Sequence, residues 1–194
     1  MTTPVTVNLQ KGSASNVNRG AAGALSNTQN VHGGDGGNKL TGNAQGNILI
    51  GGQGANTIIG GSGRSLLIGG KGPSAITGGS GGSAAGGDIL IGGRTVYDNM
   101  TPANEAALMS ILAEWQSKDS YAIRFSAIST GKGGGLNGNK LNWGTTVFDN
   151  LQVNTFTAQA AKRGTAVAAV DWFFANKERT TIKNCSVGEH LNNT

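Results

Sequence analysis

The sequence predicts a mainly β protein in which short parallel strands stack along a solenoid, and three observations predict it. A nine-residue unit recurs from Gly33 to Thr77, and an interrupted copy ends at Ile91. Glycines open the units, where tight turns need backbone angles that other residues resist. The eighth position is always apolar, as expected for one inward side chain per short strand. These inward positions are Leu40, Leu49, Ile58, Leu67, Ile76 and Leu90.

The repeats divide the chain into three segments. Residues 1–32 are polar, and apolar alternation over residues 5–9 predicts one short strand followed by polar coil, with Val31 starting a degenerate first unit. Residues 33–93 are the repeat region. Residues 94–194 form a helix plus a small α+β extension that we expect to pack on the repeats.

The extension begins with signals for a helix. Thr101 is a typical N-cap residue, and Pro102 suits the first helical position. A shorter helix or turn is expected around residues 121–128, and strands are expected near 146–148, 155–157 and 172–175. For residues 158–169, helix and loop both stay open. The first helix carries one apolar stripe, formed by Leu108, Ile111, Leu112 and Trp115.

The repeat units read GGDGGNKLT, GNAQGNILI, GGQGANTII, GGSGRSLLI and GGKGPSAIT, followed by a last unit ending GGDILI. They resemble the haemolysin-type calcium-binding nonapeptide G-G-x-G-x-D-x-U-x, which winds into a parallel β-roll with two units per coil. The later chain also resembles the C-terminal region of large repeat proteins of planctomycete-type bacteria. The matching segments are DILIGG at 88–93, AEW at 113–115, LNG at 136–138, TVFD at 146–149 and DWFFA at 171–175. This resemblance implies a secreted or surface-associated, calcium-binding protein.

The sixth position of the unit departs from that family, which has aspartates there that clamp Ca²⁺. Here only Asp88 and Asp171 keep the family carboxylate at this position. Asn154 stands where the family has an aspartate, in a segment that reads NTFT. Calcium takes about 6–8 oxygen ligands, and the number of charged ones tunes its affinity. We therefore expect calcium binding to be weak or absent, with Asp88 and Asp171 as the candidate ligands. The rest of this column reads Asn38, Asn47, Asn56, Ser65 and Ser74.

Two interpretations of this column stay open. In the first, the stacked Asn and Ser side chains hydrogen-bond to one another's turns, and the roll folds without metal. In the second, residual weak binding persists near Asp88, helped by Asp35 or Asp98.

If successive units fall on opposite sheets, their seventh and ninth positions point outward. One outer face is then polar or small (Lys39, Thr41, Thr57, Ile59, Ala75, Thr77), and the other is wholly aliphatic (Ile48, Ile50, Leu66, Ile68, Ile89, Ile91). An aliphatic face of this kind is not left in water. We expect the helix at 102–116 to cover it, and a second subunit is the alternative.

Composition excludes several function classes. The formal net charge is +5, whereas the repeat family that the chain resembles is acidic because of its calcium-binding aspartates. Loss of the aspartates at the sixth position accounts for most of this difference. The basic residues are scattered, which disfavours a nucleic-acid site. No apolar run approaches the roughly 20 residues of a membrane span. Cys185 is the single cysteine, so no internal disulfide is expected.

The sequence does not point to an enzyme. His32 and His190 fit no triad or zinc spacing, and the G-x-S-x-G match at 78–82 lies inside the glycine repeat without the strand-turn-helix context of a nucleophile elbow. Three tryptophans offer a sugar-binding platform, but core packing is favoured for Trp115 and Trp172, which leaves Trp143.

We therefore expect an extracellular or cell-surface structural or adhesive module that self-associates. Strand addition by residues 2–9 to a neighbour's sheet edge is one route. The alternative is a calcium-responsive folding or export module of a secreted repeat protein. An ice-binding solenoid fits less well, because Thr41, Thr57 and Thr77 form no regular array. The chain reads equally well as a fragment of a longer protein or as a carrier domain.

Overall fold

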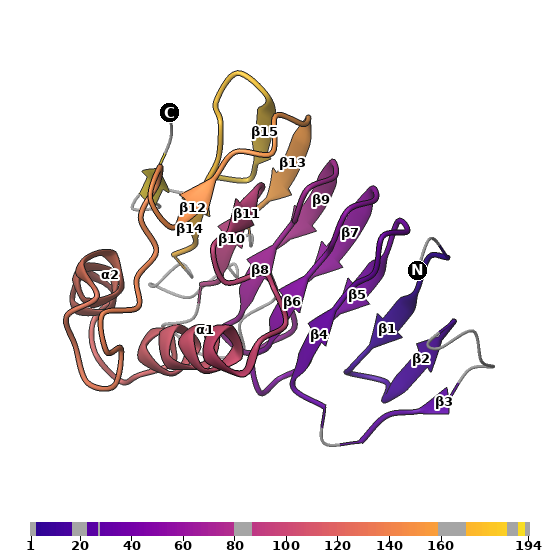
Figure 1. Ribbon diagram of the computed structural model, residues 1–194, viewed down its shortest axis with the longest axis horizontal. Coiled ribbons are helices and arrows are strands. Elements are labelled where there is room, and N and C mark those ends of the chain that lie inside the picture. Colours follow the sequence, from indigo (N-terminus) through magenta and orange to yellow (C-terminus); the bar gives the residue numbers. More distant parts are fainter. Residues whose placement is uncertain are drawn as a thin grey trace.

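The computed structural model describes residues 3–16, 23–26, 28–79, 87–158, 170–185 and 190–192. Within these residues the protein is mainly β, with two large sheets that are mostly parallel and two helices (Figure 1). Neither helix is long and apolar enough to cross a membrane, and only the described residues were considered for this statement.

The larger sheet has eight strands in the order β15-β13-β9-β7-β5-β1-β2-β3. The other has six, in the order β16-β14-β10-β8-β6-β4, and β11 pairs with β12 in a small third sheet. The eight strands are β1 (Thr6–Asn8), β2 (Ser13–Ser15), β3 (Gly23–Ala24), β5 (Lys39–Thr41), β7 (Asn56–Ile59), β9 (Ser74–Thr77), β13 (Asn154–Thr157) and β15 (Thr180–Lys183). The others are β4 (Asn30–His32), β6 (Ile48–Ile50), β8 (Leu66–Ile68), β10 (Ile89–Ile91), β14 (Trp172–Phe174), β16 (His190–Asn192), β11 (Arg94–Thr95) and β12 (Val147–Phe148).

Successive repeat strands alternate between the two large sheets. Leu40 of β5 pairs in parallel with Ile58 of β7, and Leu49 of β6 pairs with Leu67 of β8. Each strand therefore meets the strand two units later, as the nine-residue period predicts. All six predicted inward residues are buried, and they form one core together with Phe156 and Phe173 of later strands. The two phenylalanine rings stack with their centroids 5.9 Å apart.

The helices cover the aliphatic face. Helix α1 (Pro102–Trp115) has Thr101 as N-cap, whose side chain accepts a hydrogen bond from the Asn104 N–H, and α2 (Tyr121–Thr130) follows it. Both lie together on the side of the six-stranded sheet that faces away from the eight-stranded sheet (Figure 1). The prediction of cover from within the chain is confirmed, because the α1 stripe and the six outward aliphatic residues share one buried cluster.

The N-terminal prediction is partly wrong. One short strand followed by polar coil was expected, but β2 and β3 lie within the segment predicted as coil. Val31 does begin a degenerate unit, since β4 pairs with β6. Strand β1 lies inside the eight-stranded sheet, paired with β5 on one side and β2 on the other. Of the predicted segment 2–9, the described residues 3–9 therefore do not supply a free strand for a neighbour, because Val7 and Leu9 are already buried in the chain's own core.

The C-terminal strands at β12, β13 and β14 lie where the sequence predicts them, but β15 and β16 were not predicted. Phe156 pairs with Ile182 of β15, and Phe173 pairs with Leu191 of β16. These strands extend both sheets by one more level. Within the open segment 158–169, Ala158 is buried against the inner core, and residues 159–169 lie outside the described residues.

The covered face can be tested with matched substitutions at the ninth position of two units. Ile68 is fully buried under the helices, whereas Ile59 is only half-buried on the outer face of the eight-stranded sheet. Ile68→Asp buries an unpaired charge and should lower the free energy of unfolding by about 3–5 kcal/mol, while Ile59→Asp should cost much less. Urea denaturation followed by circular dichroism measures both. Equal losses at the two positions would contradict the assigned cover.

Candidate functional site

The sixth-position side chains form a buried column in each large sheet. In the eight-stranded sheet the column contains Asn38, Asn56, Ser74 and Asn154, each at most 4% exposed. The Asn38 N–H donates to Asn56 Oδ1 at 3.0 Å, and the Ser74 N–H donates to Asn154 Oδ1 at 2.9 Å. Asn38 Oδ1 in turn accepts from the Val5 N–H. The side chains thus supply acceptors to the backbone of the preceding level.

The column of the six-stranded sheet is continuous over four levels. The Asn47 N–H donates to Ser65 Oγ at 3.1 Å, the Ser65 N–H donates to Asp88 Oδ1 at 2.6 Å, and the Asp88 N–H donates to Asp171 Oδ1 at 2.7 Å. All four side chains are buried. We call the two columns together the polar ladder. The predicted hydrogen bonding of stacked Asn and Ser is therefore confirmed.

Glycine carbonyls crowd the asparagine amides of the polar ladder. Asn38 Nδ2 lies 3.0 Å from the oxygen of Gly34, 2.7 Å from that of Gly36 and 2.6 Å from that of Gly51. A side-chain NH₂ group has only two hydrogens to donate. The acceptors around Asn38 thus outnumber the available hydrogens, and this environment favours positive charge.

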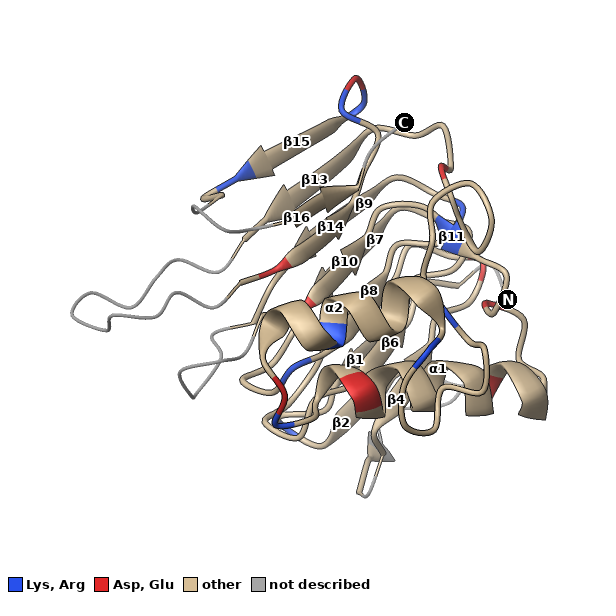
Figure 2. Cartoon of the chain, turned by 90° about the vertical axis from the view of Figure 1, so that its left-hand side faces the viewer, with Lys and Arg blue, Asp and Glu red and all other residues tan. Residues whose placement is uncertain are grey.

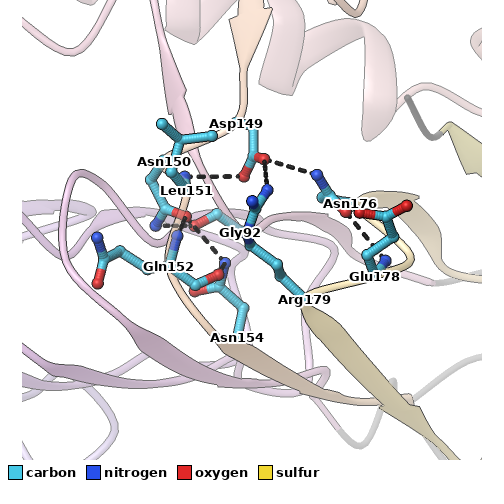
Figure 3. A network of polar contacts seen from close by, with 9 residues as sticks. All are labelled: Gly92, Asp149, Asn150, Leu151, Gln152, Asn154, Asn176, Glu178 and Arg179. Carbon is cyan, nitrogen blue, oxygen red and sulfur yellow. Dashed lines mark hydrogen bonds and ion pairs between the residues drawn. The ribbon is translucent and has the colours of Figure 1, made fainter.

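A second asparagine amide surrounded by glycine carbonyls, that of Asn150, was not predicted from the sequence. Asn150 Nδ2 is within hydrogen-bond distance of the carbonyl oxygens of Gly70, Gly72 and Gly92, at 2.8 to 3.1 Å. Figure 3 shows the contact with Gly92. Its Oδ1 accepts from Asn154 Nδ2 at 3.0 Å. Asn150 thereby joins the turn before β13 to three glycines of the repeats. No periodic signal marks this residue, because it lies outside the nine-residue pattern.

Asp149 ties the same turn to the C-terminal strands. Its carboxylate accepts from the Leu151 N–H at 3.1 Å and from Asn176 Nδ2 at 2.8 Å, and an Arg179 guanidinium nitrogen lies 3.5 Å away (Figure 3). Leu151 adopts a positive φ of 59°, which few residues with a side chain do. The turn is therefore fixed by side-chain contacts from two directions.

Asp88 and Asp171 occupy neighbouring levels of the polar ladder. Asp88 uses both carboxylate oxygens, because Oδ2 accepts from the Gly79 N–H at 2.6 Å while Oδ1 accepts from Ser65. Burial, and secondarily the charge of Asp171, raises the pKa of Asp88 to about 8. Hydrogen bonds from Gly79 and Ser65 act in the opposite direction, but burial outweighs them.

The other carboxylates named as helpers serve local contacts. Asp98 accepts from the hydroxyl and N–H of Thr95, and Asp35 accepts from Gln53. In the part of the chain that the structure describes, no group of three or more His, Cys, Asp or Glu residues is placed to hold a metal ion. Asp88 and Asp171 stay predicted calcium ligands, and Asp35 and Asp98 do not join them in such a group.

The remaining candidates from the sequence are dispersed. His32 and His190 lie on β4 and β16, the two opposite edges of the six-stranded sheet. Most of the G-x-S-x-G match at 78–82 lies outside the described residues. Trp115 and Trp172 are fully buried, as predicted, whereas Trp143 is half-buried.

Comparisons of the chain with protein-family models, with curated proteins and with solved structures gave no match. The resemblance to haemolysin-type repeats therefore stays a prediction that rests on the motifs quoted above, and the chemistry of the site must be interpreted from its own residues.

The buried carboxyl group of Asp88 predicts a pH dependence of stability. Between its ordinary pKa of 3.8 and its folded pKa of about 8, the folded protein holds a proton that the unfolded chain has released. This stabilisation is complete below pH 4 and is lost as the pH rises to about 8, with a slope of up to about 1.4 kcal/mol per pH unit. Urea denaturation at a series of pH values measures it.

The variant Asp88→Asn should flatten this slope, since it removes the titrating group. Asp35→Asn is the control, because Asp35 is exposed and a hydrogen bond from Gln53 lowers its pKa, so the slope should persist. A wild-type protein with equal stability at pH 5 and pH 8 would show that burial does not raise the pKa of Asp88.

Proposed function

We propose that this chain is a structural module, a parallel β-roll of nonapeptide units that is held together by amides and hydroxyls in place of most calcium ions. The observation that carries the proposal is the buried polar ladder, whose column in the six-stranded sheet is continuous over four levels. Its side-chain oxygens accept hydrogen bonds from backbone N–H groups of neighbouring levels, for example Ser65 N–H to Asp88. An oxygen engaged in this way already has a partner in the protein, so the ladder can be satisfied without a metal ion.

We further propose an extracellular or cell-surface location and a spacing or adhesive role, and the family resemblance supports both. The outer face of the eight-stranded sheet carries Lys39, Thr57 and Ala75 as exposed residues, so it offers a polar surface. Lys, Arg, Asp and Glu are spread over many elements rather than gathered in one patch (Figure 2). This distribution favours neither a nucleic-acid partner nor a catalytic cluster.

Self-association is proposed through the C-terminal edges of the sheets. Strands β15 and β16 are the last strands of their sheets, and each pairs with one neighbour among the described strands. Ile182 and Leu191 are only partly buried there, although they continue the inner core. Unpaired strand edges with apolar residues beside them favour pairing with another strand. We therefore propose self-association through the edges of β15 and β16 in place of strand addition by residues 2–9.

The metal independence of the module is tested by circular dichroism, thermal melting and light scattering in calcium and in excess EDTA. We expect the same β-rich spectrum and the same melting temperature in both conditions, because the ladder needs no added ligand. Particles larger than a monomer should appear in both. A chain that becomes β-rich only in calcium would overturn the proposal.

The alternative is the calcium-responsive module. It is favoured by the surplus of glycine oxygens around Asn38 and Asn150 and by the adjacent carboxylates of Asp88 and Asp171. A cation would be attracted to such oxygens. The calcium and EDTA experiment separates the two proposals, since only this alternative needs calcium for folding.

The self-association route is tested at the first residue of β15. The carbonyls of Arg179 and Lys183 accept from β13, so by strand alternation the backbone groups of Thr180 face the open edge. Thr180→Pro removes the outward N–H at a position that tolerates proline. We expect it to reduce the assembled fraction severalfold in light scattering.

Thr180→Ala is the matched control, because it shortens the same side chain but keeps the N–H. If Thr180→Ala and Thr180→Pro reduce assembly equally, the side chain rather than the strand edge is responsible. Assembly that persists unchanged in Thr180→Pro would exclude this edge.

A further inference from the structure

A pocket of about 370 Å³ lies between α2, the segment after it and β16. Its apolar wall consists of Phe125, Leu141, Trp143 and Leu191. This volume is within the range of about 300–1,000 Å³ that small-molecule sites occupy. None of the polar ladder residues lines the pocket, so it is separate from the site described above.

Neighbouring rings and loops hold the aromatic residues of the wall in place. Trp143 stacks on Phe174 with a centroid distance of 6.4 Å and an interplanar angle of 11°. Phe125 packs against Trp172 at 4.8 Å and against His190 at 4.2 Å. The tight turn after Trp143 is closed by the Gly144 N–H, which donates to the Val147 oxygen at 2.8 Å. The wall is therefore pre-formed, which lowers the entropy cost of binding a ligand.

Three polar side chains line the pocket with hydrogen-bonding capacity to spare. Ser129 Oγ is buried and has no hydrogen-bond partner among the described residues. The side-chain amides of Asn142 and Asn192 also make no hydrogen bond within that part of the chain. A buried hydroxyl without a partner costs about 1–3 kcal/mol. A ligand that supplies hydroxyl groups here would relieve this cost.

Among the described residues, the lining contains no Lys, Arg, Asp or Glu. A phosphate, a carboxylate or a cation would find no opposite charge there. A purely apolar ligand would leave the three polar groups unpaired. The ligand that matches both parts has a flat apolar face for the rings and hydroxyl groups at its edge. A neutral sugar has this form, because its C–H groups gather on one face of the ring.

We propose that this pocket is a carbohydrate site that binds a neutral sugar unit, stacked on Trp143 and hydrogen-bonded by Ser129, Asn142 and Asn192. The site needs no calcium at the polar ladder, since no ladder residue lines it, but Leu191 and Asn192 place it beside β16, one of the two edges proposed for self-association. A sugar bound there would give the module a means of attaching to polysaccharide.

The test is isothermal titration calorimetry of the full chain with neutral oligosaccharides as probes, namely maltotriose, cellotriose and triacetylchitotriose. We expect saturable binding of at least one probe. Trp143→Ala should weaken it at least tenfold, and Asn142→Ala and Ser129→Ala should weaken it severalfold. Asn142 is exposed, so its variant keeps the fold even if loss of Trp143 disturbs the turn.

Phe148→Ala and Gln152→Ala are the controls, because one is a half-buried aromatic and the other an exposed amide outside the pocket. Both should bind like the wild type. In NMR spectra, the indole N–H signal of Trp143 should shift on titration, while that of Trp115, bonded to the Gly87 oxygen, should not. Absence of binding to all three probes, or wild-type affinity in both Asn142→Ala and Ser129→Ala, would overturn the assignment.

Discussion

The structure depends on the hydrogen bonds that the polar ladder supplies to stacked turns. The turns approach so closely that a side chain in place of Gly51 or Gly69 would collide with a glycine oxygen of the next level. Water is excluded there, so the backbone N–H groups need acceptors from within the protein. The sixth-position side chains provide them, as Asn56 Oδ1 does for the Asn38 N–H. The inner core and both sheets are built around this requirement.

The same geometry explains why neutral amides suit these positions. Glycine carbonyls converge on Asn38 Nδ2 and on Asn150 Nδ2, and the partial positive charge of an NH₂ group matches them in part. A carboxylate brings a full negative charge into that interior, and the raised pKa of Asp88 reflects the cost. A neutral column avoids this cost, and this is the physical basis of the proposed metal-independent roll.

Periodic features of the fold were predictable, and single long-range contacts were not. The inward residues, the aliphatic face and its covering helix follow from the nine-residue period and from helix spacing. Strand β1 was predicted from its alternation, but its place inside the sheet is set by tertiary pairing with β5. The Asn150 side chain donates to carbonyl oxygens of glycines that lie 58 to 80 residues earlier in the sequence. Ile182 and Leu191, which extend the core, belong to no repeated unit. No local pattern encodes such contacts.

Buried polar side chains of the repeats and of the extension differ in whether they have hydrogen-bond partners. Among the residues that the structure describes, no ladder side chain is buried without a hydrogen bond, whereas Ser129 and Thr180 of the extension are. Native proteins pair almost all buried polar groups, so the exceptions need an explanation. The repeats have used their polar groups to hold themselves together. In the extension, the unpartnered Ser129 hydroxyl lines the proposed sugar pocket, so the proposed recognition site lies there rather than in the repeats.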